Sequence, residues 1–105
     1  MIFKNARLGS RLGKAHGLLL SKQYEKSYQL LSSILSAEPA DYLLQTLYSD
    51  LGIVEYHRGN FQKSIHYLEF CIKDYNKNPK LWESHVQKEL LKQVLWYHEE
   101  SEKQI

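Results

Sequence analysis

The sequence predicts an all-α fold of five helices and no strand, because apolar residues recur at helical spacing and one such pattern occurs twice. The first copy consists of Tyr24, Tyr28, Leu31 and Leu35. The second copy lies 37 residues later and consists of Phe61, Ile65, Leu68 and Ile72. Intervals of four, three and four residues place each copy on one face of a helix. A repeat of this length is typical of supersecondary units that stack on one another.

The first pair of helices is expected over residues 6–21 and 24–37. Glu38 ends the second of them, because the residue before a proline, here Pro39, is disfavoured in the helical region.

The second pair is expected over residues 41–58 and 61–75. Gly59 supplies a left-handed turn between these two helices. Asn60 is a good residue to cap the helix that follows.

The fifth helix is expected over residues 79–101 as one continuous element, since no glycine or proline occurs after Pro79. Asn78 is its expected cap, and a proline is favoured at the first helical position. Its apolar stripe consists of Trp82, Val86, Leu90, Val94 and Tyr97, widened by Leu91 and Leu95.

Composition predicts one ordinary globular domain. The chain has 105 residues, of which 43% are hydrophobic and 25% charged. A net charge of +2 is too small to imply a polyanionic partner, and the single cysteine, Cys71, excludes an internal disulfide. The longest apolar run, residues 18–20, is far too short to span a bilayer.

The N-terminal segment carries no acidic residue before Glu25. Its basic residues are Lys4, Arg7, Arg11, Lys14 and Lys22. Such a segment is compatible with an organelle transit peptide, but the repeat continues through it, which favours a first helix with a solvated basic face. A cytoplasmic protein is then expected.

Further residues of the second copy match a known family, at Tyr48, Leu51, Gly52, Gly59, Ser64, Leu68 and Cys71. Over residues 45–78 this pattern resembles the tetratricopeptide repeat (TPR). Glu55 departs from an expected tyrosine, and Asn76 stands in place of the closing proline.

Residues 8–41 resemble the same repeat more weakly. Ala15 occupies the glycine position, Ser27 the small-residue position, and Pro39 the closing proline. Arg11 and Lys14 depart from apolar positions of the family.

The resemblance implies a single domain over residues 1–105, an α-solenoid of two helix-turn-helix TPR-like repeats and a long capping helix. Such a fold implies a partner protein bound in a concave apolar groove. The family register places in this groove Leu12, His16, Leu19, Leu20, Ser49, Ile53, Tyr56, His57, Glu83 and Gln87. Tyr56 is the expected anchor, because aromatic residues dominate interface energetics. The paired lysines and asparagines with which some family members hold a terminal carboxylate have no counterpart here.

Gly9, Gly13 and Gly17 recur every four residues in the first helix. Each glycine costs about 1 kcal/mol relative to alanine inside a helix, or roughly 3 kcal/mol together. Close packing against the second helix or another backbone is the favoured reason. The alternative is a self-association face, or a helix that a partner orders.

No catalytic motif occurs, so the chain is not expected to be an enzyme or to hold a cofactor. The five histidines form no pair at three- or four-residue spacing, which argues against a metal site; they are His16, His57, His66, His85 and His98. Cys71 occupies a core position and is expected to be inert.

Charge argues against nucleic acid as the partner. Residues 1–26 carry six basic and one acidic side chain, a net +5, whereas residues 27–57 carry four acidic and no basic ones, a net −4. This alternation interrupts any continuous basic track for phosphates.

The function expected from sequence is a dedicated inhibitor, an immunity protein or a chaperone that covers an apolar segment of its partner. A subunit adaptor or a homodimeric scaffold is the alternative. A nucleic-acid-associated protein that uses the basic first helix is a further one.

Overall fold

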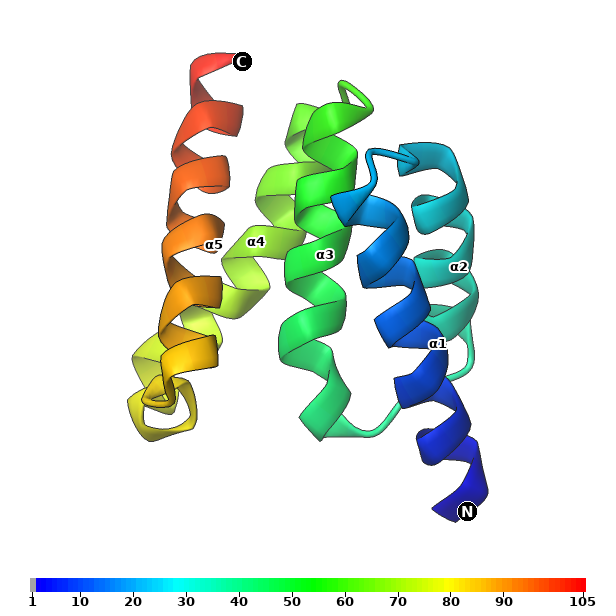
Figure 1. Cartoon of the computed structure of the whole chain (residues 1–105). Coiled ribbons are helices and arrows are strands. Elements are labelled where there is room, and N and C mark those ends of the chain that lie inside the picture. The colour runs from blue at the N-terminus through cyan, green and yellow to red at the C-terminus, as the bar shows by residue number, and fades with distance from the viewer. Residues whose placement is uncertain (1) are drawn as a thin grey trace.

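Five α-helices make up most of the computed structural model, which describes residues 2–105 (Figure 1). They are α1 (Ile2–Leu20), α2 (Tyr24–Ser36), α3 (Leu44–His57), α4 (Phe61–Lys77) and α5 (His85–Lys103). Two short 3-10 helices precede α3 and α5, namely η1 (Asp41–Leu43) and η2 (Pro79–Trp82). No strand occurs over residues 2–105, so the prediction of an all-α chain with five helices is confirmed.

The prediction of one continuous helix over residues 79–101 is wrong. The chain leaves η2, and Ser84 adopts an extended conformation with φ −64° and ψ 157°. The hydroxyl of Ser84 accepts a hydrogen bond from the backbone N–H of Gln87 at 3.2 Å, so Ser84 is the N-cap of α5. The break removes only the start of the expected stripe from the core: Val86 is 71% exposed, whereas Trp82 and Val94 are buried as predicted.

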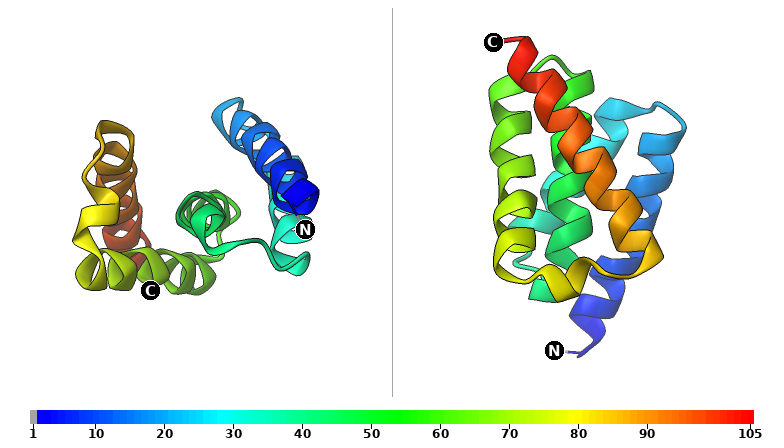
Figure 2. Two further views of the ribbon diagram at one scale, coloured as in Figure 1. Left: turned by 90° about the horizontal axis from the view of Figure 1, so that it is seen from below. Right: turned by 90° about the vertical axis from the view of Figure 1, so that its left-hand side faces the viewer.

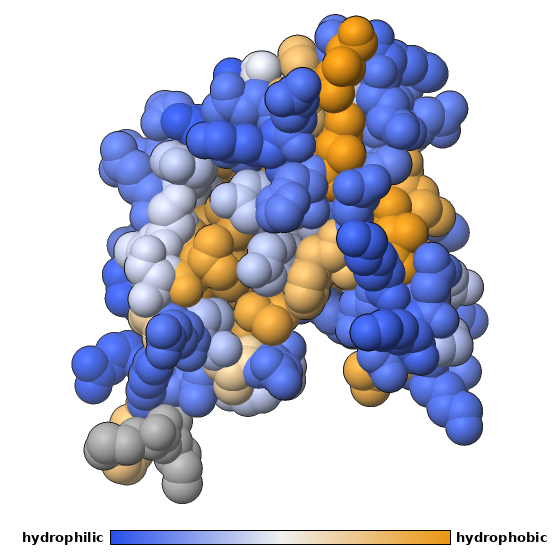
Figure 3. Space-filling view, turned by 180° about the vertical axis from the view of Figure 1, so that it is seen from behind, coloured by the Kyte–Doolittle hydropathy of each residue, from blue (hydrophilic) through white to orange (hydrophobic). Residues whose placement is uncertain are grey.

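The helices form a U when the molecule is seen along their axes (Figure 2, left). The helices α1 and α5 are the two arms, and α3 lies recessed between them. The partners of α1 and α3, α2 and α4, form the outer side of the U. Figure 1 therefore looks into the concave side. Figure 3 shows the opposite side, where apolar side chains reach the surface in the middle of the face and in a column that runs to its upper edge, with polar side chains on both sides.

The 37-residue periodicity of the sequence recurs in buried hydrogen bonds. Ser27 Oγ donates to the carbonyl of Ala15 at 2.8 Å, and Ser64 Oγ donates to the carbonyl of Gly52 at 2.6 Å. Each bond joins the two helices of one pair at equivalent positions. The turns are equivalent as well, with positive φ at Lys22 (63°) and at Gly59 (83°).

The core consists of two clusters. The larger joins α1, α2 and α3 around Leu31, Ile34 and Leu47. The smaller joins α4, η2 and α5 around Leu68, Trp82 and Val94. Both clusters bury the stripes that the sequence pattern predicts, apart from the start of α5.

The helices α3 and α4 approach most closely at Gly52. A Cβ atom at this position would lie 2.4 Å from Cδ2 of Leu68, which is fully buried. Only glycine fits this position without movement of the core. The equivalent residue of the first pair is Ala15, which is fully buried.

Candidate binding groove

A groove of about 560 Å³ lies between the arms of the U; it is called the α1–α5 groove below. Its lining is Gly9, Leu12, Gly13 and His16 of α1, Thr46 of α3, and His85, Val86, Gln87, Glu89, Leu90 and Gln93 of α5. The lining is mostly apolar, and the volume falls within the range of about 300–1,000 Å³ that is usual for ligand pockets.

Three of the residues expected in a concave groove line this one: Leu12, His16 and Gln87. Gly9 and Gly13, which the sequence marks as a possible self-association face, line it too. The two sets of residues therefore belong to one surface.

The other expected groove residues lie elsewhere. Ser49 is fully buried, and its hydroxyl donates to the carbonyl of Gln45 at 2.7 Å. Ile53 and Leu19 are buried in the core. Leu20 and Glu83 are exposed at the ends of their elements and do not line the groove.

His16 and Asp50 connect the groove wall to its floor. Nδ1 of His16 lies 3.1 and 3.0 Å from the two carboxylate oxygens of Asp50, which is fully buried. The hydrogen bond to Asp50 raises the pKa of His16, against a smaller opposing effect of burial. Burial raises the pKa of Asp50, and the bond from His16 opposes this shift. The pair therefore places a charge-assisted hydrogen bond beside an apolar groove.

The remaining predicted residues, Tyr56 and His57, belong to an aromatic cluster. Its members are Tyr24, Tyr56, His57, Phe61, Trp96 and Tyr97. His57 stacks on Tyr24 with ring centroids 4.3 Å apart, and its Nε2 lies 3.2 Å from the hydroxyl of Tyr97. Burial, and then the charge of Lys22, lower the pKa of His57.

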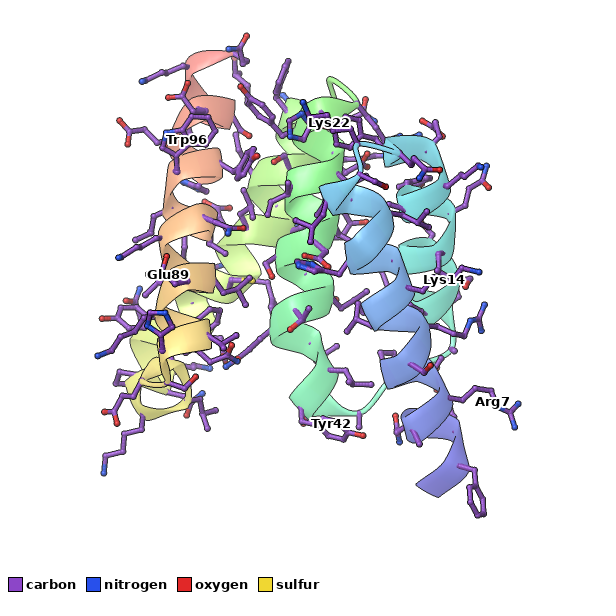
Figure 4. The ribbon with its side chains drawn as sticks, in the orientation of Figure 1. Arg7, Lys14, Lys22, Tyr42, Glu89 and Trp96 are labelled. Carbon is purple, nitrogen blue, oxygen red and sulfur yellow. The ribbon has the colours of Figure 1, made fainter. Side chains whose placement is uncertain are left out.

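The aromatic cluster lies at the end of the molecule where Figure 4 labels Trp96 on α5 and Lys22 beyond α1. Tyr56 packs edge-on against Tyr97 at 5.2 Å and Trp96 at 6.3 Å, so it already contributes to holding α5 on α3. Trp96 is 53% exposed and offers the larger free aromatic surface.

The expectation that the glycines of α1 serve close packing is wrong for two of the three. A Cβ atom at Gly13 or Gly17 would meet no atom within 4 Å, and one at Gly9 would make an ordinary contact of 3.7 Å with Leu43. Packing within the chain therefore does not explain a combined cost of roughly 3 kcal/mol in helix propensity. A self-association face remains a prediction.

Sequence reasoning missed Asp50, Thr46 and Trp96. Asp50 falls between apolar residues of a helix, and its partner lies 34 residues away, so no local pattern identifies it. Of the three, only Trp96 could have been noticed in the sequence, because it is an aromatic residue outside the predicted apolar stripe of its helix.

A buried polar cluster links the turns at this end of the molecule. The carboxylate of Glu55, almost fully buried, accepts from Arg58 at 2.5 Å and from Asn60 at 3.2 Å. Arg58 also donates to Glu25 at 2.7 Å and lies 3.6 Å from the centre of the Tyr28 ring. Glu55 stands where the tetratricopeptide pattern has a tyrosine, and its charge is neutralised by Arg58, which follows it in the same turn.

Over residues 2–105 no group of three or more His, Cys, Asp or Glu side chains could hold a metal ion. Cys71 is fully buried, so the prediction that it occupies a core position is confirmed, and burial raises the pKa of its thiol to about 12. No helix in this part of the chain has the length and apolar character needed to cross a membrane.

No protein family model, curated protein or solved structure matches the chain.

Proposed function

We propose that this chain is a non-catalytic binding protein that holds an apolar segment of a partner protein in the α1–α5 groove. The observation that carries the proposal is the groove itself, since its α5 wall presents Val86, which is 71% exposed, next to the partly buried Leu90. A hollow with an apolar lining and exposed apolar rims is typical of interaction sites.

We also propose that the helices form two TPR-like repeats followed by a capping helix. The equivalent bonds from Ser27 and Ser64 and the equivalent turns at Lys22 and Gly59 support this arrangement. So does the position of α1, α3 and α5 on the concave side of the U (Figure 2). In such an arrangement the first helix of each pair lines the groove.

A dedicated inhibitor, an immunity protein or a chaperone fits a small chain that acts by covering its partner. The alternative is a subunit adaptor or a homodimeric scaffold, for which the glycine row of α1 is the expected contact.

Capture of the partner from native lysate, followed by variants, tests the proposal. Gly13→Leu places a side chain in the groove where the backbone has free space around it, so the variant is expected to fold and to lose the partner. Lys14→Leu adds an apolar side chain to the same helix outside the groove and is expected to bind normally. A partner that binds Gly13→Leu as tightly as the unmodified chain would refute a role for the groove.

A further inference from the structure

The glycine row of α1 leaves part of one wall of the α1–α5 groove without side chains, between Leu12 and His16. Gly9 and Gly13 line the groove, and added Cβ atoms at Gly13 and Gly17 would lie in open space. The intrinsic stability of α1 is lowered with no gain in packing inside the chain. Absent side chains let the backbone of an occupant approach α1 closely.

The groove is lined by three helices, α1, α3 and α5, and offers no strand edge that could pair with an extended backbone, which favours a helical occupant. An extended segment would bury its own N–H and C=O groups, which need partners. The side chains of the lining do not replace a strand edge: Gln87 donates to the side chain of Gln45 and Glu89 is paired with Lys92, which leaves the side chains of His16, Thr46, His85 and Gln93. A helix satisfies its backbone internally.

The spacing of the arms is compatible with a helix. The helices α1 and α5 each pack against α3. Packed helix axes lie about 8–10 Å apart, so two arms packed on a recessed α3 have axes at most roughly 16–20 Å apart. A helix that packs on both arms needs about 8–10 Å from its own axis to each arm, which this separation allows.

His16 adds a requirement for a particular group on that helix. Asp50 engages Nδ1, whereas Nε2 has no hydrogen-bond partner within residues 2–105, and the side chain is 41% exposed at the groove wall. An apolar occupant that covers His16 would leave this donor unsatisfied, which is unfavourable. The buried carboxylate of Asp50 on the opposite side of the ring stabilises the imidazolium form, so an anionic acceptor is the best complement to Nε2–H.

The other charged groups of the groove do not replace such an acceptor. Glu89 lies on the α5 wall together with His85, and its carboxylate is paired with Lys92 at 3.1 Å. The charge of Asp50 is compensated by His16 itself.

We propose that the occupant of the α1–α5 groove is a partner helix that packs against Gly9 and Gly13 and presents a Glu or Asp side chain to Nε2 of His16. This inference rests on the function proposed above and specifies the partner segment by its chemistry.

A displayed library of amphipathic helical peptides, selected on the unmodified chain and counter-selected on Gly13→Leu, tests the inference. The selected peptides are expected to share one carboxylate within the apolar face. Replacement of that Glu by Gln in a synthetic peptide is expected to weaken binding about 10-fold, because the bond to His16 is charge-assisted.

The double variant His16→Gln/Asp50→Asn removes both charges and leaves no buried carboxylate unpaired. It is expected to bind the Glu and Gln peptides equally, while Lys14→Leu retains the 10-fold difference. If the Glu and Gln peptides bind the unmodified chain equally, the proposed carboxylate contact with His16 is wrong. If the selection yields no helical peptide whose binding is lost in Gly13→Leu, the proposed helical occupant is wrong. Neither result would refute the proposed function, that the groove binds a partner protein. That function is tested separately, by the binding of the captured partner to Gly13→Leu.

Discussion

At the scale of single residues, the pair of His16 and Asp50 makes the stability of the protein depend on pH. The pKa of His16 is raised above its ordinary value of 6.5 in the folded state by its bond to Asp50. The bond therefore stabilises the fold fully below pH 6.5, and this contribution is lost as the pH rises through the folded-state pKa. The raised pKa of Asp50 acts in the same direction at lower pH.

We expect the free energy of unfolding to fall by roughly 1 kcal/mol between pH 6 and pH 9, since an ion pair this exposed on one side is screened by solvent. Urea denaturation at a series of pH values measures it. The double variant His16→Gln/Asp50→Asn serves as the reference and should show a flatter profile. Identical profiles for the two proteins would mean that the pair does not titrate in this range.

Single residues also mark the limit of prediction from sequence. His16 could be assigned to the groove because the repeat register fixes its helix face. Asp50 could not, because a buried carboxylate has a role only with its partner, and that partner is distant in sequence. The glycines of α1 are visible in sequence, but only the structure separates Gly13, with open space, from Gly52, which is confined.

At the scale of elements, Gly52 and Gly13 should respond in opposite ways to alanine. Gly52→Ala forces a Cβ atom against Leu68 and is expected to lower the free energy of unfolding by about 1–3 kcal/mol, as overpacking does. Gly13→Ala gains helix propensity at no steric cost and should raise it by up to about 1 kcal/mol. Thermal unfolding of both variants provides the measurement. A stabilised Gly52→Ala would show that the contact of α3 with α4 is looser than described.

The start of α5 depends on a single cap. Ser84→Ala removes the acceptor for the N–H of Gln87 and is expected to destabilise the protein by about 1 kcal/mol, whereas Ser84→Asp should retain stability. Chemical denaturation of the two variants tests this, with the exposed Ser10→Ala as a control within a helix. A loss equally large in Ser84→Asp would exclude capping as the cause.

The same cap explains why the fifth helix was predicted incorrectly. Pro79 does begin a helix, but it is the 3-10 helix η2, and the prediction that Asn78 caps it is wrong, because the side chain of Asn78 makes no capping hydrogen bond and donates to Asp74 instead. The hydrogen bond from the N–H of Gln87 to the hydroxyl of Ser84 starts a new helix at this point and competes with a helix that continues from η2. An uninterrupted apolar pattern does not reveal which of the two arrangements is more stable.

The sequence pattern identified the four preceding α-helices, although α3 begins at Leu44 after the 3-10 helix η1 rather than at Asp41. The predicted cap Asn60 makes no capping bond, because its side chain donates to Glu55.

At the scale of the whole molecule, binding and stability should separate at Trp96. Trp96→Ala removes an exposed ring that touches Tyr56 and Tyr97, so stability should fall by about 1 kcal/mol or less. If the partner extends from the α1–α5 groove onto the aromatic cluster, affinity should fall by at least about 10-fold. Titration calorimetry with the captured partner measures this, and Leu95→Ala, a neighbouring exposed apolar residue, is the matched control. If Trp96→Ala and Leu95→Ala lose the same affinity, the partner does not contact the aromatic cluster.

The U shape of the molecule has a mechanical consequence. The arms α1 and α5 pack mainly against α2 and α4, which form the outer side of the U, and less extensively against α3. Rotation at any of these contacts changes the distance between the arms, so the width of the groove depends on the packing around the whole U. An occupant that contacts both arms would therefore restrict their motion relative to each other. The distribution of distances between spin labels on the outer faces of α1 and α5 should become narrower once the occupant is bound.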